Sequence, residues 1–114
     1  MYPENSIPAF LHAIKMGADG IELDVRLSRD NRVMVIHDAS IDRVSRGSGS
    51  VAEFGAAELR RSALVDSSGA PHTDTCIPVL EELLETVDSI AINIDLKTAE
   101  RGLARAVADI IRRY

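Results

Sequence analysis

The chain of 114 residues has the length of a single domain, and its 46% hydrophobic and 27% charged residues are the composition of a folded protein, which excludes a disordered tail. The 13 basic and 18 acidic residues give a net charge of −5, which argues against nucleic acid or an anionic membrane as a partner. The single Cys76 excludes an internal disulfide and a cysteine-based zinc site. No stretch reaches the roughly 18 apolar residues of a membrane span, so we expect a cytoplasmic protein.

From the start of the chain, segments whose apolar residues have helical spacing alternate with segments whose apolar residues have strand spacing. Apolar residues spaced three and four apart predict a helix over residues 6–16, with Asn5 or Ser6 as its cap and Gly17 at its end. Strict alternation then predicts a strand over residues 20–27. One face of this strand is apolar and the other carries two carboxylates, so the strand is expected to turn an acidic face away from the core.

The middle of the chain combines one apolar run with a long and loosely patterned excursion. Residues 33–36 are apolar on both faces, which predicts a central parallel strand. The Ser- and Gly-rich residues 45–50 are expected to form a flexible connector, and a phosphate cradle of backbone N–H groups is the alternative. A short helix is predicted over residues 56–64.

The last third of the chain returns to regular elements. Pro78 opens a predicted helix whose apolar stripe reaches Val87, residues 90–97 alternate as a strand, and Thr98 is expected to cap a final helix. Short turns between helices and strands indicate parallel crossovers, and therefore an α/β fold, either layered or barrel-shaped. In such folds the chemistry lies at the carboxyl ends of the strands.

Ionisable side chains gather at the predicted carboxyl ends of the strands. Glu22 and Asp24 lie two residues apart on one face of a strand, with their Cα atoms roughly 6.5 Å apart. Asp95 and Lys97 share a face of another strand, and His37 follows a third. Carboxylates that converge repel one another unless a cation compensates, and ligation by oxygen alone favours Mg²⁺ or Ca²⁺. The pattern therefore predicts a site for a divalent cation.

Each of these residues also has a purely structural interpretation. Strands that alternate polar and apolar residues are commonly half-exposed edge strands, which would make Glu22 and Asp24 ordinary surface residues. A lone histidine such as His37 at a strand end is more often structural than catalytic, and Lys97 taken alone is most simply a solvated lysine. The pattern by itself leaves both interpretations open.

Several runs of residues together resemble a known family. The runs, in chain order, are Pro3-Glu4-Asn5-Ser6, Gly17-Ala18-Asp19-Gly20-Ile21-Glu22-Leu23-Asp24-Val25, Val35-Ile36-His37-Asp38, Asp42-Arg43, Ile77-Pro78-Val79-Leu80-Glu81-Glu82 and Asn93-Ile94-Asp95-Leu96-Lys97. They resemble the glycerophosphodiester phosphodiesterase family, which is similar to other phosphodiesterases of the phospholipase C-like superfamily. The resemblance extends over nearly the whole chain.

The resemblance implies a (β/α)8 barrel of the TIM type, of which this chain holds part. Only the parallel strands two to four of the barrel, with flanking helices, are expected within residues 1–114. The family's first strand ends in a His-Arg-Gly motif that would precede Pro3, and four further βα units would follow Tyr114. We therefore expect a truncated domain that corresponds to the amino-terminal half of the barrel.

The resemblance also implies roles for the clustered residues. Glu22, Asp24 and Asp95 would bind the divalent cation, Mg²⁺ or Ca²⁺, although the family has Glu where Asp95 stands. His37 would be one of a pair of histidines and would donate a proton to the leaving alcohol, while the histidine of the His-Arg-Gly motif would activate the attacking water or hydroxyl. Lys97 would hold the phosphate. The implied reaction is the hydrolysis of a glycerophosphodiester, a small-molecule substrate, to sn-glycerol 3-phosphate and an alcohol.

Two other hypotheses remain beside the enzyme. Residues 1–114 taken alone, without the histidine of the His-Arg-Gly motif, are expected to be inactive, which would make them a half-barrel remnant or an interaction module of the same family. The chain could also belong to a barrel phospholipase that cleaves phosphoinositides and releases a cyclic inositol phosphate. In each case an open sheet would leave unpaired strand edges, which predicts self-association through those edges.

Overall fold

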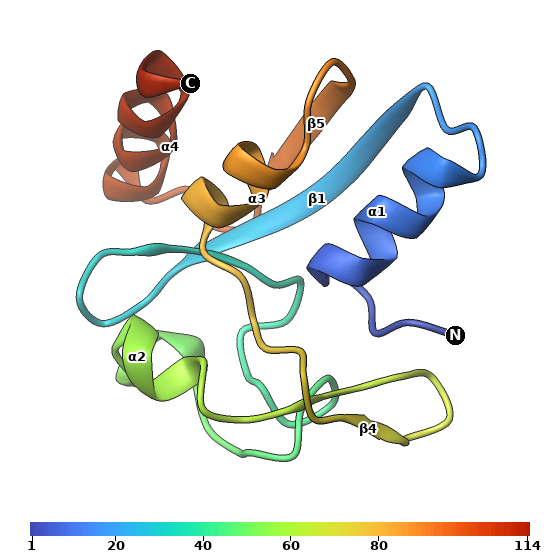
Figure 1. The fold of residues 1–114 in the computed structure, drawn as a ribbon. Coiled ribbons are helices and arrows are strands. Elements are labelled where there is room, and N and C mark those ends of the chain that lie inside the picture. The colour runs from blue at the N-terminus through green and yellow to red at the C-terminus, as the bar shows by residue number, and fades with distance from the viewer.

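The computed structural model describes residues 1–114 as a mixed sheet with helices against it and a lobe of loops below it (Figure 1). The elements are α1 (Ile7–Lys15), β1 (Gly20–Leu27), β2 (Val33–Val35), the 3-10 turn η1 (Val51–Glu53), α2 (Ala56–Leu59), β3 (Leu64–Val65), β4 (Pro71–His72), α3 (Leu80–Thr86), β5 (Ala91–Leu96) and α4 (Arg101–Arg113). Their order is the one that the sequence predicts for the major elements.

The main sheet has the strand order β2-β1-β5. Strand β5 pairs with β1 in parallel, in a register that sets Asp24 opposite Asp95. Strand β2 pairs with β1 antiparallel, so the prediction of a parallel strand over residues 33–36 is wrong. Only residues 28–32 join the two strands, and such a connection suits a hairpin, whereas a parallel pair needs a crossover of about a dozen residues.

Helix α1 begins and ends where its sequence predicts. The Ser6 hydroxyl accepts a hydrogen bond from the Ala9 N–H at 3.2 Å, which satisfies one of the free donors of the first turn. Gly17 follows the helix with a φ of 100°, a conformation that a residue with a Cβ rarely adopts. These two ends fix the point at which the chain enters β1.

The apolar face of β1 forms the centre of the main core. Ile21, Leu23 and Val25 are buried there against side chains from the helices. The buried helical partners are Phe10 from α1, Leu80 and Leu83 from α3, and Leu103, Val107 and Ile110 from α4. Because successive residues of a strand alternate between faces, this packing turns Glu22 and Asp24 to the opposite face of the sheet.

A second apolar cluster fills the lobe between residues 34 and 79. It joins Met34 and Ile36 to Leu59 and Leu64. The predicted helix over residues 56–64 ends earlier, at Leu59, because Leu64 and Val65 pair with β4 as strand β3. This lobe carries the chain from the end of β2 back to α3.

The backbone and side-chain contacts bear on two further expectations, and they correct the first of them. Thr98 does not cap α4, whose N-cap is Glu100, and the Thr98 hydroxyl is buried without a partner. The loop over residues 45–50 uses four of its six N–H groups in hydrogen bonds within the protein, which favours the predicted connector over a phosphate cradle. The Gly47 N–H donates to the Ser45 hydroxyl at 3.1 Å, and the Gly49 N–H donates to Asp42 at 2.9 Å.

The outer edge of β5 has no neighbouring strand. An apolar groove of about 220 Å³ adjoins it between α3, β5 and the end of α4. Its lining residues are Leu84, Ile90, Ile92, Ile94, Ile111 and Tyr114. None of the helices combines the length and the apolar character that crossing a bilayer requires.

Candidate active site

Three carboxylates meet on the polar face of the sheet, where β1 and β5 run side by side. Glu22 and Asp24 come from β1, and Asp95 comes from β5, directly opposite Asp24. One carboxylate oxygen from each lies within 4.8 Å of the others. The sequence predicted this convergence, and the parallel register is its physical cause.

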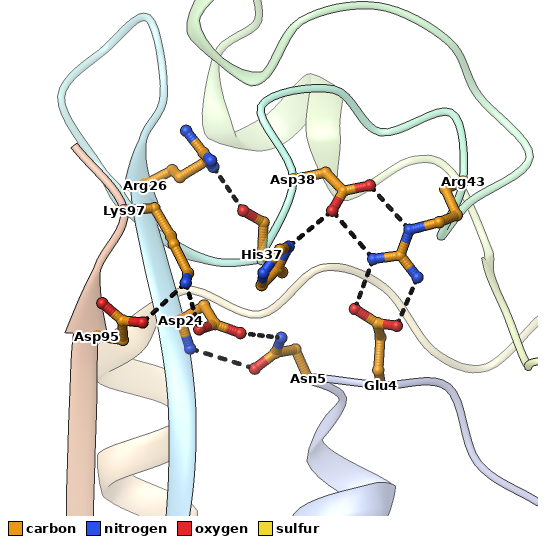
Figure 2. A network of polar contacts seen from close by, with 9 residues as sticks. All are labelled: Glu4, Asn5, Asp24, Arg26, His37, Asp38, Arg43, Asp95 and Lys97. Carbon is orange, nitrogen blue, oxygen red and sulfur yellow. Dashed lines mark hydrogen bonds and ion pairs between the residues drawn. The ribbon is translucent and has the colours of Figure 1, made fainter.

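Lys97 lies over the same carboxylates. Its backbone N–H donates to the Val25 carbonyl at 3.2 Å, which continues the ladder beyond β5 and keeps its side chain on the polar face. The Lys97 ammonium lies 2.7 Å from an Asp95 oxygen and 3.5 Å from an Asp24 oxygen (Figure 2). The hydrogen bond to Asp95 and the nearby negative charge raise the pKa of Lys97, so its positive charge belongs to the site at neutral pH.

Asn5 clasps Asp24 from the segment before α1. The Asn5 side-chain amide donates to an Asp24 carboxylate oxygen at 3.1 Å, and its amide oxygen accepts from the Asp24 N–H at 3.4 Å (Figure 2). Asn5 has a φ of 52°, in the left-handed region that asparagine tolerates better than most residues. Asp24 is only 7% exposed, so the clasp satisfies a carboxylate that has lost most of its water.

The Glu22 carboxyl has a pKa above its ordinary value of 4.5. Partial loss of hydration raises it most, and repulsion from Asp24 and a shared hydrogen bond with that carboxyl add to the effect. Lys97 opposes the shift, but one ammonium does not compensate three carboxylates. The cluster is therefore short of positive charge.

The spacing and chemistry of the three carboxylates fit a divalent cation. Opposite oxygen ligands lie up to about 5 Å apart around Ca²⁺ and about 4.2 Å apart around Mg²⁺. One oxygen from each of Glu22, Asp24 and Asp95 lies within 4.8 Å of the others, so a single cation of either kind can reach all three. The donor set consists of hard oxygens, as both ions prefer.

His37 follows β2 and reaches the same end of β1. The Ile36 N–H donates to the Asp24 carbonyl at 2.9 Å, and the Arg26 side chain donates to the His37 carbonyl at 2.8 Å. These two bonds hold the His37 backbone beside the carboxyl end of β1. The imidazole itself is half exposed, with 51% of its side chain accessible to solvent.

A second network of charges lies on the far side of His37 from Lys97 in the view of Figure 2. The His37 Nδ1 lies 2.8 Å from an Asp38 oxygen, and Arg43 donates to both Asp38 oxygens at 2.9 and 3.0 Å. Arg43 also donates to both Glu4 oxygens at 2.7 and 2.9 Å. Together these contacts link the amino-terminal segment to the loop after β2.

Sequence reasoning gave no role in the site to Asn5, Arg26, Asp38, Arg43 or Glu4. The positions of Glu4, Asn5, Asp38 and Arg43 within the family-like runs were the available signal. Arg26 had a weaker one, because it shares the face of β1 that carries Glu22 and Asp24. All five predicted site residues, by contrast, lie at one end of the β1 and β5 pair or directly beside it.

Comparison with known proteins gives a consistent result. The sequence profile of the glycerophosphoryl diester phosphodiesterase family matches residues 1–107. A glycerophosphodiester phosphodiesterase of Bacillus altitudinis is 45% identical over 104 residues, which are 86% of this chain and 41% of that protein. The chain thus spans less than half the length of this curated relative.

Solved structures of glycerophosphodiester phosphodiesterases share the fold of this chain. A glycerophosphodiester phosphodiesterase from Thermotoga maritima aligns with a TM-score of 0.80 and 37% identity over 98% of this chain and 45% of that one. Another from Agrobacterium tumefaciens aligns with a TM-score of 0.85 and 33% identity over 97% of this chain and 47% of that one. These neighbours are TIM-type barrels, so the predicted fold class, a partial (β/α)8 barrel, is confirmed.

Proposed function

The chain belongs to the glycerophosphoryl diester phosphodiesterase family, and from that premise we propose that its acidic site binds a divalent cation and acts on glycerophosphodiesters. The observation that carries the proposal is the meeting of three carboxylates within 4.8 Å at the end of two parallel strands. The carboxylates of such a cluster repel one another when no cation is bound. Partial loss of hydration and, after it, this repulsion raise the pKa of Glu22.

Each site residue has a distinct part in the proposed reaction. Glu22, Asp24 and Asp95 hold the cation, which when bound supplies Lewis-acid polarisation of a phosphoryl oxygen. Lys97 exchanges its carboxylate partners for a phosphate oxygen once those carboxylates are engaged. His37 donates a proton to the alcohol that leaves, a role that requires the imidazole to be accessible, as it is here.

We expect calcium to bind more tightly than magnesium because of the coordination that each ion requires. Ca²⁺ accepts six to eight oxygen ligands in a flexible geometry, whereas Mg²⁺ requires a near-ideal octahedron with shorter bonds. One oxygen from each of Glu22, Asp24 and Asp95 lies within 4.8 Å of the others, a limit that both ions satisfy.

The function is tested by incubating the chain with glycerophosphocholine and glycerophosphoinositol in calcium. The expected product is sn-glycerol 3-phosphate, formed more slowly by about 100-fold or more in His37→Gln. Calorimetric titration with sn-glycerol 3-phosphate measures binding of the expected product and does not depend on hydrolysis. Release of a cyclic inositol phosphate, or hydrolysis by His37→Gln at the wild-type rate, would contradict the proposal.

The same experiment separates the enzyme from the inactive interaction module. Binding of sn-glycerol 3-phosphate with calcium, but no hydrolysis of either substrate, would assign the chain to the module. Two observations support the enzyme: the Lys97 ammonium lies 3.5 Å from Asp24, and the His37 imidazole is accessible to solvent, although neither group is needed to bind a cation.

We further infer that two copies of the chain associate through the free edge of β5. A strand edge presents unpaired N–H and C=O groups that another strand can join. Leu96 at the end of this strand is 36% exposed, and the groove beside the strand is lined by apolar side chains alone. The partner of this surface is a second copy, which offers the same edge in the reverse direction.

A further inference from the structure

We propose that Asp38 is a positioning residue for His37, which holds the proton of the neutral imidazole on Nδ1 and leaves Nε2 as the atom that exchanges a proton with the substrate. The inference rests on the proposed function for its catalytic meaning. Its structural content, the identity of the protonated nitrogen, is independent of turnover.

The geometry assigns the two nitrogens different tasks. The His37 Nδ1 lies 2.8 Å from an Asp38 oxygen, and an ionised carboxylate only accepts hydrogen bonds, so Nδ1 must donate. This is the one hydrogen bond of the imidazole ring, and Nε2 is therefore free. Because Nε2 is on the other side of the ring, it faces away from Asp38.

The Asp38 carboxylate is held in place by its other partners. Arg43 donates to both of its oxygens and, with the same guanidinium, to both oxygens of Glu4. Paired donors from a planar guanidinium fix a carboxylate in orientation as well as in position. The bonds from Arg43 and His37 hold the pKa of Asp38 well below its usual range, so the carboxylate is ionised at neutral pH.

The other charged groups near His37 do not compete for the ring. Arg26 donates to the His37 carbonyl, not to the imidazole. Lys97 is engaged by Asp95 and Asp24, and the Asp24 carboxylate accepts from Asn5. Asp38 is thus the group that decides which nitrogen of His37 carries the proton.

The consequence for the reaction is a defined proton path. In the protonated imidazole both nitrogens carry a hydrogen, and transfer to the leaving alcohol breaks the Nε2–H bond and forms the alcohol O–H bond. The Nδ1–H bond remains, still donated to Asp38, so the product imidazole is already the correct tautomer. As the P–O bond to the alcohol breaks, the attacking water forms a new P–O bond and releases one proton to solvent, and solvent returns one proton to Nε2 before the next cycle.

The test is a long-range proton–nitrogen correlation spectrum of the chain with isotope-labelled histidine, recorded well above the ordinary imidazole titration near pH 6.5. His37 of the wild type is expected as the Nδ1–H tautomer. In Asp38→Ala the ratio of Nδ1–H to Nε2–H should fall by about tenfold or more, the contribution of one hydrogen bond to a charged acceptor. Arg43→Gln should give a ratio between the two.

The chain provides an internal reference and a matched control. His72 bonds Asp66 through Nε2 at 2.9 Å, so it should show the opposite tautomer and remain unchanged in every variant. Asp42→Ala removes an exposed carboxylate from the same loop without touching His37, and it should leave the His37 tautomer as in the wild type.

The outcomes separate the positioning role from the proposed function. An Nε2–H tautomer for His37 in the wild type, or the same tautomer ratio in the wild type and Asp38→Ala, would overturn the inference. A chain that fails to hydrolyse glycerophosphodiesters but shows the predicted tautomers would contradict the function and leave the positioning role standing. Asp38→Glu is the variant to use if Asp38→Ala does not fold, and restoration of Nδ1–H by the longer carboxylate supports the role.

Discussion

Replacing Glu22 with Gln should stabilise the folded chain when no divalent cation is present. The substitution keeps the shape of the side chain and removes one of three negative charges whose oxygens lie within 4.8 Å of one another. Its neighbours Asp24 and Asp95 no longer repel it, and Lys97 still pairs with both of them. Glu22 would then lower the stability of the cation-free chain in order to bind the cation.

The size of the effect follows from the distances. Two unit charges 4.8 Å apart in water repel by about 0.9 kcal/mol, and the exposure of Glu22 makes the value for water the appropriate one. Glu22 has two repelling neighbours and one attracting neighbour, so the net gain for Glu22→Gln is about 1 kcal/mol. For a domain of this length that corresponds to about 3–6 °C in Tm.

The pH dependence of the gain has a definite sign. The pKa of Glu22 is raised in the folded state, so the folded chain binds a proton at Glu22 more tightly than the unfolded chain does. The wild type therefore loses stability as pH rises and Glu22 becomes ionised. The variant and the wild type should therefore have equal Tm near pH 3.5, about one unit below the ordinary 4.5. The difference between them should appear as pH rises to neutrality.

Thermal unfolding with and without calcium is the assay. Calcium at 100 times its Kd adds about 2.7 kcal/mol to the stability of the wild type, but only about 1.4 kcal/mol to a variant that binds it tenfold more weakly, so the order of the two proteins should reverse. Glu53→Gln is the control, since Glu53 is exposed and its carboxylate has no partner. A Glu22→Gln variant that is less stable than the wild type at neutral pH without cation would refute the reasoning.

Three further predictions concern single contacts. Lys97→Met removes the ammonium that lies 2.7 Å from Asp95, so the variant should bind calcium more tightly in calorimetry. Inorganic phosphate, added after calcium, should bind to the variant more weakly. Unchanged affinity for both ligands would show that Lys97 has no part in the site. Asn5→Ala loses both bonds to Asp24 and should cost about 1–2 kcal/mol of unfolding free energy in urea, with faster amide exchange at Asp24; no change in either would show that the clasp is incidental. Ile92→Lys places a charge in the groove beside β5 and should convert dimers to monomers in sedimentation velocity, and a wild type that is monomeric at all concentrations would contradict self-association through this edge.

The major elements were predictable from local pattern. The strand over Gly20–Leu27 has the predicted bounds, because period-two alternation and the flanking glycine leave little choice. The direction of β2 was not predictable from composition, because a buried apolar run has the same residue pattern whether its strand pairs in parallel or antiparallel. The length of the connection, residues 28–32, was the decisive signal and favours a hairpin.

The candidate site was predictable to the extent that it follows strand register. Glu22 and Asp24 share a face by alternation, and Asp95 joins them because parallel strands end at one side of the sheet. The clasp by Asn5 and the clamp by Arg43 depend on long-range contacts between the first residues and later segments, which no local period encodes. Such contacts need the three-dimensional structure.

The most direct test of the proposed cation site is a calorimetric titration with Ca²⁺ and then Mg²⁺. The wild type is compared with Glu22→Gln/Asp24→Asn, which keeps both side-chain shapes and removes two of the three charges. We predict one calcium per chain in the wild type, weaker binding of magnesium, and an affinity for calcium at least about tenfold lower in the double variant. Equal binding of calcium by the two proteins would contradict the account.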